Sequence, residues 1–218
     1  MTERSMGILR MVVFTLALVG VAQALAAEQR TDKILIQGNP AGTQTVQIEP
    51  GGAVRVEYSY NDRGRGDHII ATWKLDADGL PIEYDGRGND YMKAAVEEHF
   101  EMKGGKASWK NRSEKGDQMV AGKTFYLPLN APPEFMGVLA RALLKAPGRK
   151  LALLPAGETS IEEAGKAKTD KGEFTEYRIT GLSFTRNRCG SIAKAPRRRS
   201  RPGFRLCPRD WSPRSHNS

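Results

Sequence analysis

Residues 53–75 read AVRVEYSYNDRGRGDHIIATWKL, and this stretch decides the fold class. In residues 53–60 apolar side chains alternate with polar ones, a period of two that is typical of a β-strand with one buried face. The glycine-rich residues 61–66 then turn the chain into a second extended segment, residues 67–75. The stretch therefore predicts two antiparallel strands joined by a short turn.

Similar extended segments continue on both sides of this pair. The pattern predicts further strands at residues 33–37, 43–49, 80–84, 96–103 and 106–111, separated by turns at residues 38–42, 50–52, 76–79 and 104–105. The first two of these strands are expected to pair as a hairpin. Strands joined in sequence by short turns are typical of an antiparallel meander, which bends towards a barrel or half-barrel as strands accumulate.

One segment breaks the period of two. Residues 133–145 place five apolar side chains at helical spacing, and Pro132 and Pro133 stand at the start, where proline is tolerated in a helix. We predict an amphipathic helix here. Because such a helix must bury its apolar side, we expect it to cover one open face or end of the sheet.

Two more strands are predicted after the helix, at residues 150–154 and 174–180, while residues 159–166 are compatible with either a strand or a helix. The sequence thus predicts a mainly β (α+β) fold. Its form is an antiparallel meander or half-barrel with one covering helix near residues 133–145.

The N-terminal residues 1–26 have the layout of a secretory signal peptide. Arg4 and Arg10 precede the apolar run 11–21, and residues 24–26 (ALA) fit the small-residue rule for cleavage. The alternatives are a membrane-spanning helix or a buried core helix, but the run is well short of the roughly 20 apolar residues that cross a bilayer. We therefore expect an exported protein, periplasmic or secreted if the source is bacterial, with no membrane span after cleavage.

Composition changes abruptly near residue 186. Residues 27–185 are expected to form one β-rich domain, and the chain is too short for an enzyme barrel of about 250 residues. Residues 186–218 contain ten basic residues and one acid, which together account for the whole formal charge of +9. Arginine, proline and serine dominate this tail and it has no apolar stripe, so we predict that it is disordered.

Three interpretations of the tail remain open. Clustered arginines suit nucleic acid or another anionic surface, but exported proteins seldom meet nucleic acid, so we disfavour that partner. The second is a solvated tail in which Cys189 and Cys207 form a disulfide in an oxidising compartment. The third, which we favour, is out-of-frame translation of a GC-rich gene from Arg186 onwards, because the change directly follows a well-patterned strand.

No catalytic, cofactor-binding or metal-binding residue is assigned from the sequence. His68 and His99 are the histidines before the tail, and each lies in a predicted strand beside apolar neighbours, where we expect a hydrogen-bonded structural histidine. The sequence contains no H-x-H, H-E-x-x-H or G-x-S-x-G pattern and no paired-cysteine zinc spacing. We therefore expect no cofactor in this chain and no activity of the chain alone.

Three glycine-containing motifs resemble ligand-binding turns. Residues 64–66 and 86–88, both Gly-Arg-Gly, resemble turns that hold an anion on backbone N–H groups. Residues 76–79 (DADG) resemble the start of a calcium loop without its later ligands. We interpret the first two as arginine-bearing hairpin turns and the third as a plain turn.

A set of aromatic residues suits either an apolar pocket or the core. Half-barrels with aromatic interiors bind apolar molecules. Bulky aromatic side chains in strands more often form the core, which is the interpretation that we favour. The residues are Tyr58, Tyr60, Trp73, Tyr84, Tyr91, Phe100, Trp109 and Phe125.

Five segments carry a resemblance to a known family. They are residues 38–42 (GNPAG), 58–66 (YSYNDRGRG), 105–109 (GKASW), 125–134 (FYLPLNAPPE) and 177–185 (YRITGLSFT). Together they resemble the N-terminal β-rich region of exported bacterial amidohydrolases, which are related to imidazolonepropionase-like enzymes. The resemblance covers about residues 30–185.

In that family a metal-dependent barrel follows the β-rich region, and its H-x-H and later His, Lys and Asp residues hold the metal that activates water. This chain departs from the family at Arg186 and has none of those motifs. The resemblance implies an exported accessory domain of an amidohydrolase-like protein, truncated before the barrel and inactive alone. It also implies self-association through the apolar face that the barrel would cover. The alternative is a periplasmic β-domain that binds an apolar ligand or a partner protein without catalysis.

Overall fold

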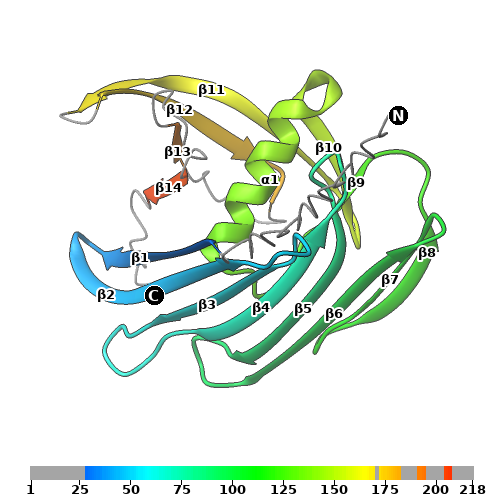
Figure 1. Cartoon of the computed structure of the whole chain (residues 1–218), viewed down its shortest axis with the longest axis horizontal. Helices are drawn as coiled ribbons and strands as arrows, with labels where there is room; N and C mark the ends of the chain where they lie inside the picture. The colour runs from blue at the N-terminus through cyan, green and yellow to red at the C-terminus, as the bar shows by residue number, and fades with distance from the viewer. Residues whose placement is uncertain (1–27, 170–171, 183–190, 195–203, 208–218) are drawn as a thin grey trace, which may run out of the picture.

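A computed structural model describes residues 28–169, 172–182, 191–194 and 204–207. The signal peptide predicted at residues 1–26 lies outside them. The described chain is mainly β, as the sequence predicts, and forms two sheets with one α-helix lying between them (Figure 1). Among the described residues, no helix combines the length and the apolarity that crossing a membrane requires.

The first sheet is an antiparallel meander in which each strand pairs with the next along the chain. It curls so that its inner face is turned towards the helix (Figure 1). This arrangement confirms the predicted meander. Its strands are β1 (Glu28–Ile36), β2 (Asn39–Ile48), β3 (Val54–Tyr60), β4 (His68–Leu75), β5 (Pro81–Asn89), β6 (Ala95–Lys103), β7 (Lys106–Lys110) and β8 (Lys115–Met119).

The predicted hairpin at the start of the sheet is confirmed as β1 and β2. Its turn is tighter than the sequence indicated, because Asn39 already pairs with Ile36 and Gly42 pairs with Ile34. Gly38, with a φ of 83°, takes the left-handed conformation that this short turn needs.

The second sheet has the strand order β14-β13-β12-β11-β10-β9. Strand β9 runs parallel to β10, whereas the other neighbours are antiparallel. A parallel pair needs a long crossover, which the helix α1 (Pro133–Lys145) and the 3₁₀ turn η1 (Pro147–Arg149) supply. The strands are β9 (Thr124–Tyr126), β10 (Lys150–Leu154), β11 (Glu158–Thr169), β12 (Gly172–Thr180), β13 (Ser191–Lys194) and β14 (Phe204–Cys207).

Two parts of this sheet could not be read as strands from the sequence alone. The ambiguous residues 159–166 belong to β11 and are therefore strand. Strands β13 and β14 lie within the tail that was predicted to be disordered, and the structure differs from the prediction there; the rest of that tail lies outside the described residues. Backbone pairing needs no apolar stripe, and without β13 the N–H and C=O groups along that edge of β12 would be unpaired.

Helix α1 spans the residues that the sequence predicts and fills the inner face of the first sheet. Pro132, which directly precedes the helix, supplies no side-chain cap, and the side-chain oxygen of Gln44 instead accepts a hydrogen bond from the N–H of Glu134 at 2.9 Å. Phe135, Leu139 and Leu143 are fully buried. The helix therefore covers the sheet as expected.

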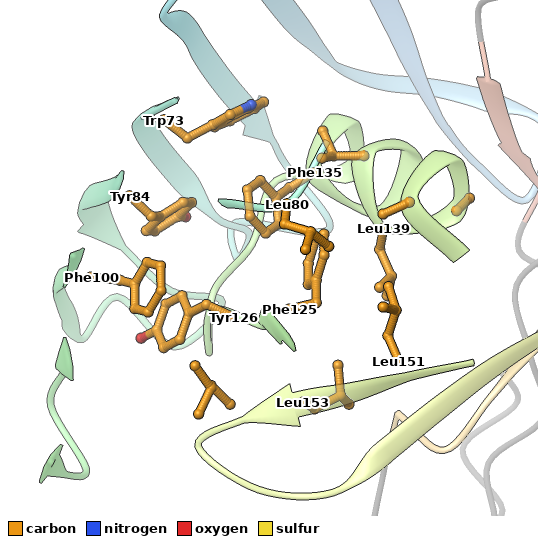
Figure 2. Close-up of a cluster of buried hydrophobic side chains, with 14 of the residues drawn as sticks. Trp73, Leu80, Tyr84, Phe100, Phe125, Tyr126, Phe135, Leu139, Leu151 and Leu153 are labelled. Carbon is orange, nitrogen blue, oxygen red and sulfur yellow. The ribbon is translucent and has the colours of Figure 1, made fainter. Parts of the chain in front are cut away.

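The core is an aromatic cluster around Phe135. Its ring centroid lies 5.0 Å from that of Trp73, 5.1 Å from that of Tyr84 and 5.5 Å from that of Phe125. Figure 2 shows these rings meeting between the first sheet, α1 and the second sheet, with Leu151 and Leu153 of β10 on the side of the second sheet. The two sheets and the helix thus share one core.

Gly88 marks a close approach between β4 and β5. Its φ is 140°, and a Cβ there would lie 1.9 Å from the carbonyl oxygen of His68. We expect Gly88→Ala to lower the free energy of unfolding by about 2 kcal/mol or more. Gly165→Ala is the matched control, because Gly165 has open space around it, and we expect a change within about 0.5 kcal/mol. Urea unfolding measures both, and equal stabilities would contradict the prediction.

Candidate functional site

A row of polar side chains crosses five strands on the outer face of the first sheet. The register pairs Arg55 with Thr72, Thr72 with Asp85, Asp85 with His99, and His99 with Lys110. Successive side chains in a strand alternate between faces, so the buried residues next to these five point to the inner face. The row therefore belongs to the face that α1 does not cover.

This row and its neighbours enclose a depression of about 530 Å³, which lies within the size range of ligand sites, about 300–1,000 Å³. We call it the outer-face depression. Ile70 and Thr72 on β4 are short, and the longer side chains of Arg55 on β3 and Arg87 on β5 flank them. The residues that matter for its chemistry are Arg55, Thr72, Asp85, Arg87, His99 and Lys110.

Three cations of the depression have no partner in the described part of the chain. Arg55, Arg87 and Lys110 form no ion pair or hydrogen bond through their side chains with a described residue. In contrast, two other cations of the outer face, Lys74 and Lys106, are paired.

Lys74 lies 2.8 Å from Glu83, and Lys106 lies 2.7 Å from Asp117. The hydrogen bond to Glu83 raises the pKa of Lys74, and the one from Lys106 lowers the pKa of Asp117. The outer-face depression is thus a place where positive charge is left available.

His99 and Asp85 form the one close pair inside the depression that the described residues show. The Nδ1 atom of His99 lies 2.7 Å from Oδ1 of Asp85, and both side chains are more than half exposed. Thr72 lies on the other side of Asp85 in the register. The hydroxyl therefore neighbours the carboxylate and not the imidazole, an order that differs from that of a Ser-His-Asp triad.

The histidines differ in part from the expectation. The predicted hydrogen bond of His99 is confirmed, but its side chain lies on the exposed outer face, because its apolar neighbour Phe100 points inwards. His68 stands at the start of β4, opposite Asn89, four residues along β5 from the partner of His99. The structure therefore does not bring the two histidines together.

A buried acid, Glu98, lies on the inner face. It is 5% exposed, and its Oε1 atom accepts hydrogen bonds from Tyr126 Oη at 2.7 Å and from the N–H of Leu129 at 2.9 Å. Its Oε2 atom accepts from the same N–H at 3.1 Å and from that of Asn130 at 3.4 Å. Burial raises the pKa of Glu98, and these donors oppose the shift.

Buried acids with a raised pKa are candidates for proton transfer. The partners of Glu98, however, belong to β9 and to the loop that leads into α1. We therefore interpret Glu98 as the anchor of that loop. Sequence reasoning missed it, although the alternation of Val96, Glu98 and Phe100 places an acid at an inward position.

The two Gly-Arg-Gly motifs adopt different structures. Residues 64–66 form a turn as predicted, and its N–H groups are already used: Gly64 donates to Asn61 Oδ1 at 2.7 Å and Arg65 to the carbonyl of Asp62 at 3.1 Å. For residues 86–88 the predicted turn is wrong, because they continue β5. This places Arg87 in the outer-face depression.

The remaining motif and the aromatic set follow the expectation. Residues 76–79 form a plain turn, in which Asp76 Oδ1 accepts from the N–H groups of Asp78 at 2.9 Å and Leu80 at 2.8 Å. Of the aromatic set, six side chains are buried in the core, whereas Tyr60 and Tyr91 are half-buried and stack at 6.4 Å. Burial raises the pKa of Tyr60 to about 12. The buried six are Tyr58, Trp73, Tyr84, Phe100, Trp109 and Phe125.

Comparison with known proteins adds no relative. The chain matches no family model, and it matches neither a curated protein nor a solved structure. The chemistry of the outer-face depression and the roles of the buried residues are therefore read from this chain alone.

Proposed function

We propose that the chain is the exported β-rich accessory domain of an amidohydrolase-like protein, and that it supports a catalytic barrel without catalysis of its own. The observation that carries the proposal is the position of the segments that bear the family resemblance. Four of the six described aromatic side chains in these segments are buried in the core and so belong to the framework of the fold. Those buried in the core are Tyr58, Trp109, Phe125 and Tyr126.

The longest of these segments, residues 125–134, shows the same role most clearly. It supplies β9, the loop that Glu98 holds, and the first turn of α1, which Gln44 caps. A family resemblance that is concentrated in such structural positions indicates a similar fold. This supports an accessory domain, in which the shared residues maintain a structure that stands beside the reacting groups.

A β-domain that binds a partner or a ligand is the second candidate. The outer-face depression favours it, because three cations there are unpaired among the described residues. The apolar-ligand form of this alternative is less well supported. The inner face, where such a ligand would bind, is occupied by α1 and by the ring of Phe135.

Self-association through an apolar face stays a prediction. The large apolar side chains that are exposed in the described chain lie on separate elements, and two of them, Leu35 and Met119, are on the opposite edge strands of the first sheet. The other two are Met92, in the turn between β5 and β6, and Leu129, in the loop before α1. Sedimentation velocity over a tenfold concentration range would measure the association.

Sequencing of the source locus tests the proposed function. We would read the codons for residues 184–218 and about a thousand bases beyond in all three frames, a length that holds a barrel of typical size. We expect a shifted frame that encodes H-x-H and the later metal ligands. A confirmed stop codon followed by unrelated or intergenic DNA would contradict the accessory-domain proposal and favour the binding domain.

Export has its own test. Expressed with its own N-terminus in a bacterial host, the chain is expected to appear in the periplasm or medium with Ala27 as its first residue, because residues 24–26 fit the cleavage rule. Intact mass and N-terminal sequencing measure this. A cytoplasmic product that retains Met1 would contradict export.

A further inference from the structure

We propose that the outer-face depression, which the cations Arg55, Arg87 and Lys110 line, is a binding site for a small oxyanion, a carboxylate or a phosphate. The inference goes beyond the proposed function, because an accessory role for the barrel does not require a ligand on the outer face. It rests on the geometry of the first sheet, on the charges that line the depression, and on the finding that its three cations form no ion pair or hydrogen bond with a described residue.

The sheet brings the three cations together from distant parts of the chain. Arg55 lies on β3, Arg87 on β5 and Lys110 on β7, so each is two strands from the next. Neighbouring strands are about 4.8 Å apart, which places β5 about 10 Å from β3 and from β7, whereas β3 and β7 are about 19 Å apart. Arg87 stands on the strand between the other two cations, so its long side chain is able to share one ligand of a few ångströms with Arg55 or with Lys110.

The chemistry of the three cations suits an oxyanion. A guanidinium presents a planar fork of N–H donors that matches a carboxylate or phosphate, and such charge-assisted bonds are stronger than neutral ones. Arg87 stands opposite Glu97 in the register but forms no ion pair with it. Its donors, like those of Arg55, are therefore not used by the described chain.

The acids of the depression narrow the choice of ligand. Asp85 shares one carboxylate oxygen with His99, and Glu97 and Glu98 also line the depression. The carboxylate of Glu98 is buried and bonded to Tyr126 on the inner face, so on the outer face the three cations exceed the two remaining acids by one charge. A multiply charged polymer would meet the acids as well as the cations. A compact anion that also carries a hydroxyl or amino group matches better, because Asp85 accepts a hydrogen bond and Thr72 offers a hydroxyl.

Site-resolved NMR of the full mature chain tests the proposal. Sodium phosphate and sodium succinate are titrated separately at constant ionic strength, and amide shifts are followed along β3 to β7, so that binding by the arginine-rich tail is not counted. We expect saturable shifts at Thr72, Asp85, Arg87 and His99 with at least one probe. A response to phosphate alone or to succinate alone identifies the ligand chemistry, and either supports the site.

Two double variants with the same change in charge separate a site from general attraction. We expect Arg55→Gln with Arg87→Gln to weaken binding about tenfold or more, since two charge-assisted contacts are lost. Lys74→Gln with Lys106→Gln removes two paired cations from the same face outside the depression, and we expect a change of less than about twofold. Asp85→Asn is expected to tighten phosphate binding, because a nearby negative charge is removed.

Three outcomes would overturn the proposal. They are shifts that do not saturate with either probe, shifts confined to residues outside β3 to β7, or equal weakening by the two double variants. Thermal unfolding of each variant shows whether it is folded. Because the substituted side chains form no buried contact, we expect melting temperatures within about 2 °C of the parent chain.

Discussion

Phe135→Ala is expected to lower the free energy of unfolding by about 3–5 kcal/mol, the largest effect of any single change considered for this chain. The side chain is fully buried and stands between Trp73, Tyr84 and Phe125. Removing the ring leaves a cavity that three other rings, held by their own strands, are unable to fill. For a chain of this size the melting temperature should fall by about 6–20 °C.

Leu129→Ala is the matched control for this prediction. Leu129 is also a large apolar residue close to α1 in sequence, but its side chain is 53% exposed, so we expect a change within about 0.5 kcal/mol. Urea unfolding followed by tryptophan fluorescence measures both variants. A loss below about 1 kcal/mol for Phe135→Ala would show that the inner face is not closed by this ring.

Glu98→Ala is expected to cost about 3 kcal/mol or more, because it leaves the hydroxyl of Tyr126 and the N–H groups of Leu129 and Asn130 without their acceptor. Glu97→Ala is the control, since the adjacent acid points to the outer face and is exposed. We expect it to change stability by no more than about 0.5 kcal/mol. Similar losses for the two variants would contradict the anchoring role of Glu98.

The pH dependence of stability gives an independent readout of Glu98. Burial holds its pKa above the ordinary value of 4.5, so the folded chain binds this proton more tightly than the unfolded chain. The corresponding stability is complete below pH 4.5 and is lost as the pH rises through the raised pKa. Glu98→Gln does not titrate, so the stability of this variant relative to the parent should improve as the pH rises through that range. A difference that does not vary with pH would contradict the raised pKa.

The elements predicted from the sequence are those in which local pattern and burial agree. Strand β3 alternates apolar and polar residues, β4 alternates in burial although Ile69, Ile70 and Ala71 are all apolar, and α1 has a clear apolar side with proline at its start. Each of these elements therefore shows its buried face within its own residues. Strands β8 and β9 were missed. The first is KGDQM, which has no alternation, and the second is three buried residues whose partner β10 lies beyond a helix.

The outer-face depression could not be predicted from the pattern of any single strand, because its residues come from several strands. Arg87 and His99 stood out in the sequence, but only the register of β5 against β6 brings them to one place. Arg55 and Lys110 belong to no motif. The glycine pair of residues 86–88 is typical of a turn, whereas in the structure the absence of a side chain at Gly88 allows β4 to approach closely.

The order of the strands has a consequence for how the chain acquires its structure during synthesis. Hairpins of the first sheet involve neighbours in sequence and close quickly, whereas the cap of α1 by Gln44 joins residues 90 positions apart. Until α1 emerges, the aromatic inner face carrying Trp73 and Phe100 has nothing to cover it. A nascent chain would therefore expose an apolar sheet face during that interval, the stage at which holding chaperones bind and at which aggregation begins.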